Sequence, residues 1–393
     1  MFSVSIEQRV LATALKYLQP TVGKNSTQLG DNCISMQTTG NGSIKLYTTN
    51  TIEFTELEAI VAVGGNTTEQ APLVDFARFK AIIDSIPENE YISLEANVND
   101  LLINFAQKKV PVKLTGCTNG MIPLPGGFGS SAVTIPKDYI HSVTENVCNI
   151  ITDDMSAPIY NCMRVWTNGN SVETSALDMK GRRMFVQTGL CTGNNPTTEI
   201  LIEASKMKKS LKIFEDYNEI EFYVSQGAIK ICPTDPKGGL QGASTMIANI
   251  AYYTRIINGA YPPNINNHFY PQPTEFSEIN KDEVMKCIMR VKAVEDKTLN
   301  GTIGFRIDGN NAVVTLNSAY GNLEDNITTE NTIAKPIGTV FKYEHLSDIM
   351  KAIGTDSFEI GVLPNHPTNF IIKAKGSTDV MFTLPGMVGS ATP

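Results

Sequence analysis

A helix-like spacing of apolar residues, followed by two alternating strands, is the most regular pattern along the chain. In Asp75–Phe105 the apolar residues recur every three or four positions before Pro87, which predicts a helix with one apolar stripe. Two runs typical of strands follow, at Tyr91–Leu94 and Leu101–Phe105, with Asn and Asp turn residues between them. The stripe consists of Phe76, Phe79, Ile83 and Ile86. The segment therefore predicts a helix and a pair of strands.

The same unit occurs twice more, in Glu203–Ile231 and Lys342–Ala374. The stripes of these two copies are Ala204, Met207, Leu211 and Phe214, and then Leu346, Ile349 and Ile353. The predicted strands are Ile220–Val224 and Ala228–Ile231 in one copy, and Phe358–Leu363 and Phe370–Ala374 in the other. The first strands of successive copies begin 128 and 138 residues apart (Ile92, Ile220, Phe358). Such self-similarity at a long period indicates tandem structural repeats.

Each copy is preceded by an earlier half of the same kind. Helices are predicted at Ile6–Leu18, Pro136–Ile151 and Lys281–Val294, and alternating strands follow from Ser43, Ser171 and Ala312. The 393 residues therefore divide into three domains of about 131 residues, predicted at 1–126, 127–258 and 259–393. Ile122–Ser131 is one linker, and the region before Gly259–Pro262 is the other. The predicted fold class is α+β, with antiparallel sheets and helices on one face.

Composition narrows the classes of protein. The net charge is −8, only 18% of residues are charged, and no apolar run is long enough for a membrane helix. The N-terminus lacks the basic start and long apolar core of a signal peptide, so a cytoplasmic protein without membrane contact is expected. The seven cysteines form no CxxC pair, which predicts reduced and mostly buried thiols.

No catalytic residue, cofactor or metal is predicted. The four histidines are far apart and lack metal-ligand spacing. The run Gly126–Ser131 lacks the Gly-Lys-Ser/Thr ending of a phosphate loop, so it is interpreted as linker. The acidic pairs Asp153-Asp154 and Glu324-Asp325 are adjacent residues of strands or turns, where side chains diverge and acids are common.

Basic residues gather on the predicted helix faces opposite the apolar stripes. The candidate phosphate-contacting residues on or just after these helices are Arg9, Lys16, Lys24, Lys206, Lys208, Lys209, Lys212, Lys286, Arg290 and Lys297. Ordinary solvated lysines are one interpretation of these faces. The other is a basic surface on an acidic protein, which would contact phosphates without reading sequence. Aromatic residues do not interleave with these lysines, which argues against a platform for single strands.

Four segments carry a resemblance to a known family. They are Val74–Pro87 (VDFARFKAIIDSIP), Ser175–Val186 (SALDMKGRRMFV), Gly259–Pro271 (GAYPPNINNHFYP) and Phe382–Val388 (FTLPGMV). Their order and spacing, together with the threefold repeat, resemble the bacterial DNA sliding clamp, the beta subunit of DNA polymerase III. The chain departs from that family in the inserted Met179-Lys180, in Arg182 where His is common, and in Gly386 within the Pro-Met pair of the tail.

The resemblance implies a non-catalytic replication protein. Two crescent-shaped chains would close head to tail into a homodimeric ring, by pairing an edge strand of domain one with one of domain three. Sheets would form the outside and helices would line the hole. Such a ring encircles double-stranded DNA independently of sequence. It tethers the polymerase catalytic subunit and other replication and repair proteins as a processivity factor, and it is placed on DNA by a clamp loader.

The resemblance also implies a pocket for partner peptides between the second and third domains. The matching positions are Tyr160, Leu177, Gly181, Arg182, Arg183, Met184, Pro262, Phe382, Leu384, Pro385 and Met387. We expect Leu384, Pro385 and Met387 to form the floor with Leu177 and Met184, and the two arginines to lie on the rim. The competing interpretation is that Met184, Phe382 and Leu384 are core residues of strands.

Two other classes of protein remain open from the sequence. One is a β-rich structural or assembly protein with duplicated domains, for example a viral tail protein, because Asn-, Thr- and Gly-rich strands suit it. The other is a hydrolase with duplicated domains. The repeated basic helix faces argue against both. A native mass near twice 42.9 kDa would favour the clamp, and a larger assembly would favour the structural protein.

Overall fold

The computed structural model confirms a mixed fold of antiparallel sheets with few helices. It describes residues 1–23, 30–106, 110–117, 126–128, 132–151, 158–178, 183–193, 198–225, 227–235, 245–257, 259, 261–262, 265, 269–294, 301–318, 320–331, 333–364 and 366–386. The contacts divide the chain into two compact units. Unit 1 comprises Met1–Ile140, Cys191–Asn195 and Lys206–Ile256, and unit 2 comprises His141–Leu190, Pro196–Ser205 and Ile257–Pro393.

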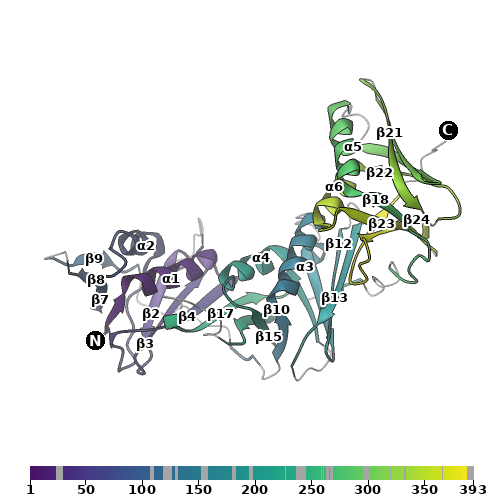
Figure 1. The fold of residues 1–393 in the computed structure, drawn as a ribbon. Helices are drawn as coiled ribbons and strands as arrows, with labels where there is room; N and C mark the ends of the chain where they lie inside the picture. Colours follow the sequence, from purple (N-terminus) through teal and green to yellow (C-terminus); the bar gives the residue numbers. More distant parts are fainter. Residues whose placement is uncertain are drawn as a thin grey trace. The chain divides into compact units, whose positions relative to one another are not determined.

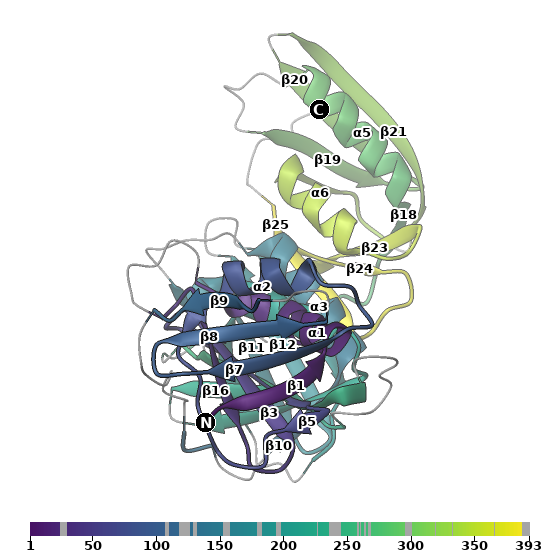
Figure 2. The same cartoon turned by 90° about the vertical axis from the view of Figure 1, so that its left-hand side faces the viewer.

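Unit 1 contains two antiparallel sheets. The five-stranded sheet has the order β5-β1-β7-β8-β9, formed by Val63–Gly64, Ser3–Glu7, Tyr91–Ala96, Asp100–Phe105 and Val112–Thr115. Figure 2 shows β1, β7 and β8 side by side in this sheet. The eight-stranded sheet has the order β10-β15-β16-β17-β4-β3-β2-β6. Its strands are Ala132–Pro136, Glu219–Ser225, Ala228–Pro233, Ile247–Arg255, Glu53–Ile60, Ser43–Thr49, Cys33–Thr38 and Val74–Asp75.

Unit 2 contains one twelve-stranded antiparallel sheet. Its order is β14-β11-β12-β13-β25-β24-β23-β18-β21-β20-β19-β22. The strands are Thr198–Glu203, Cys162–Asn168, Ser171–Asp178, Arg183–Leu190, Val380–Pro385, His366–Ala374, Ser357–Leu363, Ser277–Asn280, Gly321–Asn331, Asn311–Ser318, Thr302–Asp308 and Ile337–Lys342. In Figure 1, α5 and α6 lie against the strands of this unit that follow β18.

Six α-helices occur in the described chain, and each begins at the residue after a strand ends. They are α1 (Gln8–Leu18), α2 (Phe76–Asp84), α3 (Lys137–Ile150), α4 (Ala204–Ile213), α5 (Lys281–Val294) and α6 (Tyr343–Ala352), with short 3₁₀ turns at Gln19–Thr21 and Pro158–Asn161. This sixfold strand–helix order matches the predicted pairs of halves. The first helix starts two residues later than predicted, because Ile6 continues the alternating burial of β1.

The sheets run across both predicted domain boundaries. In unit 1, β17 pairs with β4, so Tyr253 lies opposite Phe54. In unit 2, β13 pairs with β25, so Phe185 lies opposite Phe382. The predicted middle domain therefore contributes strands to sheets of both units, and the three-domain division stays a prediction.

The apolar stripes predicted from the sequence form the core. Phe79, Ile83, Met207 and Ile349 are fully buried, and each such side chain contributes about 1.5–3 kcal/mol relative to exposure. The described helices include none that is long and apolar enough to cross a membrane.

Candidate DNA and partner interfaces

The four lysines predicted on α4 do not share one environment. Lys208 and Lys212 are exposed and Lys209 is half-buried, whereas Lys206 is only 8% exposed. The prediction that Lys206 lies on the solvent face is wrong. The buried side of α4 is wider than the predicted stripe, because Ser210 and Ile213 are also fully buried and lie next to Lys206 on the helix.

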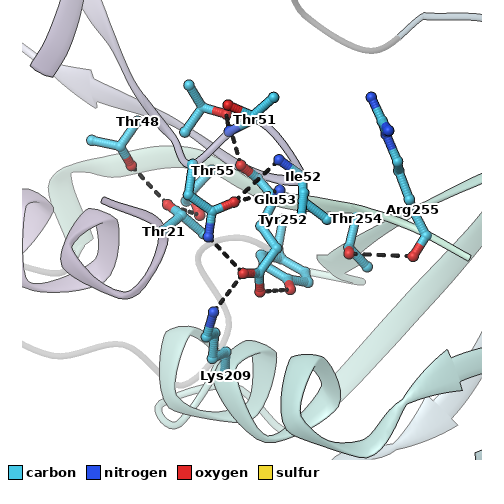
Figure 3. Close-up of polar contacts among 12 residues, drawn as sticks. Thr21, Thr48, Thr51, Ile52, Glu53, Thr55, Lys209, Tyr252, Thr254 and Arg255 are labelled. Atoms are coloured by element: carbon cyan, nitrogen blue, oxygen red, sulfur yellow. Dashed lines mark hydrogen bonds and ion pairs between the residues drawn. The ribbon is translucent and has the colours of Figure 1, made fainter. Parts of the chain in front are cut away.

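Lys209 forms an ion pair with Glu53 of β4. Figure 3 shows the ammonium group of Lys209 pointing at the Glu53 carboxylate. The same carboxylate accepts hydrogen bonds from the Tyr252 hydroxyl (2.5 Å) and the Asn50 side-chain amide (2.7 Å). Burial of Glu53 opposes its ionisation, but the hydrogen bonds from Lys209, Tyr252 and Asn50 outweigh burial and lower its pKa. The network ties α4 to the paired strands β4 and β17, so Lys209 has a structural role that the sequence did not indicate.

Three other predicted cations are also neutralised by carboxylates of their own unit. Arg9 pairs with Glu7 at 2.7 Å, Lys16 with Glu215 at 2.5 Å, and Arg290 with Asp325 at 2.7 Å. Surface pairs of this kind contribute about 0–1 kcal/mol each. They also weaken the attraction of these side chains for phosphate.

Lys212 and Lys286 are the predicted cations best placed to contact an anion. Both are exposed, on α4 and α5 respectively, and neither forms an ion pair within the described residues. Lys24 and Lys297 lie outside the described residues. DNA binding by the whole set stays a prediction.

The predicted peptide pocket is assembled only in part. Leu177 and Met184 lie opposite each other on β12 and β13 and join one apolar cluster on one face of the sheet. Tyr160 packs against the same cluster, and Pro262 is half-buried. The other members of the cluster are Cys162, Val186, Leu201, Tyr261, Ile265, Phe269, Leu363, Ile371 and Met381, with Ile159, Ile257 and Phe276 packed against it. We call it the β12–β13 apolar cluster.

Phe382 and Leu384 lie on the opposite face of the sheet. On β25 they alternate with Met381 and Thr383, and Thr383 is the residue opposite Met184. Phe382 packs on Phe185 with ring centroids 5.3 Å apart, and Leu384 lies opposite Phe370. Both are at most 1% exposed. The prediction that Leu384 forms one floor with Leu177 and Met184 is therefore wrong, and the core interpretation of Phe382 and Leu384 is confirmed.

Arg183 is not a rim residue. It lies opposite Asp178 on the face of the sheet away from Met184, with a side chain only 4% exposed. Its guanidinium donates to Asp178 at 3.0 Å, to Asp348 of α6 at 3.0 Å and to the carbonyl of Ile150 at the end of α3 at 2.8 Å. Arg183 therefore joins two strands to two helices.

His345 of α6 lies beside this arginine. Burial, together with the positive charges of Arg183 and Lys342, lowers the pKa of His345 to about 4. The imidazole is therefore neutral at physiological pH and adds no charge to the Arg183 network.

Of the other predicted pocket residues, the structure describes only Pro385. Pro385 is half-buried at the end of β25, while Gly181, Arg182 and Met387 lie outside the described residues. Two cavities of the described chain lie elsewhere. One of 550 Å³ is bordered by residues including Ile333, Val362 and Phe370, and one of 380 Å³ by residues including Val22 and Phe76.

The acidic residues that form ion pairs with Lys209 and Arg183 were not predicted from the sequence. Asp178 was within reach of prediction, because it lies five residues before Arg183 and the two residues are opposite each other on the antiparallel strands β12 and β13. Glu53 and Asp348 carried no local signal, since they lie 156 and 165 residues from Lys209 and Arg183.

These features define a class: chains of repeated strand–helix halves whose antiparallel sheets join strands that are far apart in the sequence. Nearly the whole chain is similar in fold to solved bacterial sliding clamps. A putative DNA polymerase III beta subunit from Eubacterium rectale matches with a TM-score of 0.81 at 16% identity, covering 98% of this chain and 100% of that one. The beta subunit from the DNA polymerase of Streptococcus pyogenes matches with a TM-score of 0.82 at 16% identity, again covering 98% and 100%.

The amino-acid sequence points to the same proteins. It is 20% identical over 383 residues to the beta sliding clamp of Lactococcus lactis subsp. lactis, which covers 93% of each chain. No family model matches the sequence. The chain thus has the fold of the bacterial β sliding clamps and is similar to one of them along nearly its whole length. The resemblance inferred from the sequence is confirmed, and a structural assembly protein is disfavoured.

Proposed function

We propose that the chain is a divergent DNA sliding clamp, a non-catalytic processivity factor that encircles duplex DNA as a dimer and tethers a DNA polymerase. The similarity to sliding clamps over nearly the whole chain carries this proposal. Loading by a clamp loader and a cytoplasmic location belong to the same proposal. No bond is made or broken in this function, because retention on DNA comes from the closed ring.

The two sheet joints support a specific dimer contact. Each half contributes three consecutive strands: β2–β4, β11–β13 and β19–β21 come from the earlier halves, and β7–β9, β15–β17 and β23–β25 from the later halves. At each joint the last strand of an earlier half pairs with the last strand of a later half, β4 with β17 and β13 with β25. The remaining last strands are β21 and β9. The edge of β9 away from β8 has no partner strand among the described residues, and β21 pairs with β20 on one side only along most of its length. A second copy that repeats the internal joints would pair β21 with β9.

The exposed charges on the two edges favour the same contact. β9 carries Lys113, which pairs with Asp100 but remains 59% exposed, whereas β21 carries the exposed Glu324 and the half-buried Asp325, of which Asp325 already pairs with Arg290. Two such contacts, related by a twofold axis, close a ring instead of extending a filament. They also cover edges that would otherwise favour aggregation.

A dimer prediction follows from these edges. Sedimentation at micromolar concentration should give a mass near twice 42.9 kDa. Lys113→Glu makes both edges acidic and should weaken the dimer by about tenfold, because like charges across an interface are unfavourable. Arg306→Glu changes an exposed cation on β19 and should leave the dimer intact. A wild-type chain that stays monomeric would contradict the ring.

A second prediction concerns DNA. Lys212→Glu combined with Lys286→Glu should shorten the time for which the protein is retained on nicked circular DNA. The plot of log binding constant against log salt concentration should also become less steep, by about one unit for each phosphate contact that is lost. The matched control is Arg255→Glu with Arg306→Glu, which makes the same charge change on two strands. If both double variants lose the same retention time on DNA, only net charge matters and the helix faces are not the DNA-binding surface.

A third prediction concerns partner peptides. We infer that short peptides with Leu or Phe anchors dock on the exposed margin of the β12–β13 apolar cluster, beside Tyr160 and Pro262. Affinity should be about micromolar, because a flexible peptide loses conformational freedom on binding. Tyr160→Ala removes a half-buried aromatic anchor and should weaken peptide binding about tenfold in fluorescence anisotropy. Leu190→Ala removes an exposed apolar side chain from β13 and is the control. An unchanged affinity in Tyr160→Ala would place the peptide elsewhere.

A further inference from the structure

A buried ion pair occurs at the same place of the repeat in the first joint (β4 with β17) and in the second joint (β13 with β25). Glu53 and Arg183 are the first residues of β4 and β13, and Lys209 and Asp348 are the sixth residues of α4 and α6. Glu53 pairs with Lys209, and Arg183 pairs with Asp348 at 3.0 Å. The side chains of Glu53 and Arg183 are each only 4% exposed, so each joint contains one buried charge on its strand.

The two ion pairs have opposite polarity. In the first joint the strand carries the carboxylate and the helix carries the cation, and in the second joint these charges are exchanged. The residue opposite the strand charge differs in the same sense. Asn50 lies opposite Glu53 and donates a side-chain hydrogen bond to it at 2.7 Å. Asp178 lies opposite Arg183 and accepts one from it at 3.0 Å.

The strand on the other side of each joint follows the same difference. Tyr252 and Phe382 occupy equivalent positions on β17 and β25, opposite the third residue of β4 and of β13. The Tyr252 hydroxyl donates to the Glu53 carboxylate at 2.5 Å (Figure 3). Phenylalanine at position 382 supplies no donor, which suits a joint whose strand charge is a cation. Each joint therefore has neighbours that fit only one sign of charge on the strand.

The main-chain pairing of the two joints is alike. The second residues of β4 and β13 lie opposite Tyr253 and Thr383, each two residues before the end of its strand. Main-chain hydrogen bonds are the same for every side chain, so they would also allow β4 to join β25, or β13 to join β17. Unpaired strand edges in an incompletely folded chain favour such wrong pairings.

We propose that the opposite polarity of the two joints determines which strands join. A joint between β4 and β25 would place Glu53 against Asp348, and a joint between β13 and β17 would place Arg183 against Lys209. Each wrong joint brings like charges together and leaves the buried strand charge without its partner, which is strongly unfavourable. Correct and wrong joints therefore differ in free energy although their main-chain hydrogen bonds are alike.

The contact between two copies extends this scheme, and only this step rests on the proposed dimer. By the same count its strand residue is Gly321, the first of β21, and its helix residue is Ala81, the sixth of α2. Neither residue is charged. Pairing β4 or β13 with β9 of another copy would leave Glu53 or Arg183 buried without an ionic partner, so the uncharged joint favours β21.

Exchange of the charges tests the proposal in the full-length chain. Set 1 gives the first joint the polarity of the second by Asn50→Asp, Glu53→Arg and Lys209→Asp. Set 2 makes the reverse change in the second joint by Asp178→Asn, Arg183→Glu and Asp348→Lys. Either set alone gives both joints the same polarity, whereas the two sets together exchange the polarities and keep them different. The combined variant carries every substitution of the other two and is the matched control for local damage.

Refolding from denaturant at micromolar concentration, followed by light scattering, measures the share of chain recovered at the mass of the native wild-type protein. This share should fall about threefold with set 1 or set 2 alone and return toward the wild-type share in the combined variant. Local damage from the two sets would add up in the combined variant, so its recovery reports the match between joints. The native wild-type mass is the reference whether it is that of a monomer or a dimer, so failure of the proposed dimer leaves this comparison intact.

A pair of cysteines identifies the wrong joint directly. Glu56 lies opposite Ala251 in the first joint, and Met381 lies opposite Val186 in the second. A joint between β4 and β25 would instead place positions 56 and 381 opposite each other. With Glu56→Cys and Met381→Cys, the disulfide between these positions should be about threefold more abundant after refolding of the set 1 variant than of the combined variant. Mass spectrometry of proteolytic peptides measures it.

Two results would overturn the proposal. One is a combined variant that refolds no better than either set alone, because the substitutions then act only by local damage. The other is wild-type refolding of both single sets with equal amounts of the disulfide between positions 56 and 381 in all variants. In that case the charges do not select the partner strand.

Discussion

Replacing Arg183 with methionine should destabilise unit 2 by about 3–5 kcal/mol, because it leaves a buried carboxylate without its cation. Asp178 is 3% exposed and receives two hydrogen bonds from the guanidinium, from Nε and Nη2. The substitution also removes the donor to the Ile150 carbonyl and the ion pair with Asp348. Methionine retains much of the side-chain volume, so the missing charge and hydrogen bonds dominate the effect.

The measurement is denaturant unfolding, followed by hydrogen exchange of peptides from β12, β13 and α6. The control is Arg306→Met, which breaks an ion pair whose two side chains are 52% and 48% exposed and should cost about 1 kcal/mol or less. If the two variants unfold at the same denaturant concentration, the Arg183 network does not stabilise unit 2. The double variant Arg183→Met with Asp178→Leu should recover part of the stability, because no buried charge remains unpaired on β12.

Lys209→Glu should also destabilise the protein strongly, by about 3–5 kcal/mol, because it places a second carboxylate against buried Glu53. The Glu53 side chain is 4% exposed and depends on Lys209, Tyr252 and Asn50 for its ionised form. Lys212→Glu makes the same change one turn of α4 away, on an exposed residue, and should cost about 0.5 kcal/mol or less. Thermal unfolding of the two variants, with hydrogen exchange across β4 and β17, measures the difference.

The lowered pKa of Glu53 adds a pH signature. The Glu53 carboxyl has a lower pKa in the folded than in the unfolded state. Its ionised form therefore adds to the free energy of unfolding above the unfolded-state pKa, and this contribution is lost as pH falls through the folded-state pKa. Unfolding stability should therefore fall on acidification from about pH 5, with a smaller slope in Glu53→Gln than in the wild type. A Lys209→Glu protein as stable as Lys212→Glu, with the wild-type acid slope, would show that the Glu53 network contributes little.

Deletion of the end of β25 should destabilise unit 2 in addition to removing predicted pocket residues. Leu384 is 1% exposed, and Phe382 packs on Phe185 across the joint with β13. Deletion of the residues from Leu384 onward would therefore disturb the core of unit 2 as well as any peptide site. The same deletion started at Met387 spares β25 and separates the two effects.

The amino-acid sequence by itself determined the repeated halves, because helix and strand periodicity are local properties. Stripes such as Phe76–Phe79–Ile83 need only their own neighbours to be recognised, and the structure buries them as predicted. The same local rules predicted the exposed faces of Lys212 and Lys286 correctly. The resemblance to sliding clamps also came from the order of local motifs.

The tertiary structure alone decided which cations remain available and which side of a strand faces the helices. A shift of one residue in strand register moves every side chain to the other face, so the sequence near the Met179-Lys180 insertion left the side of Arg183 open. The pairing of β13 with β12 and β25 settled it, and turned Arg183 inward to Asp348. Lys209 meets Glu53 for the same reason: the pairing of β4 with β17 brings together residues 156 positions apart. Long-range pairing of this kind depends on how whole sheets join, and no local pattern encodes it.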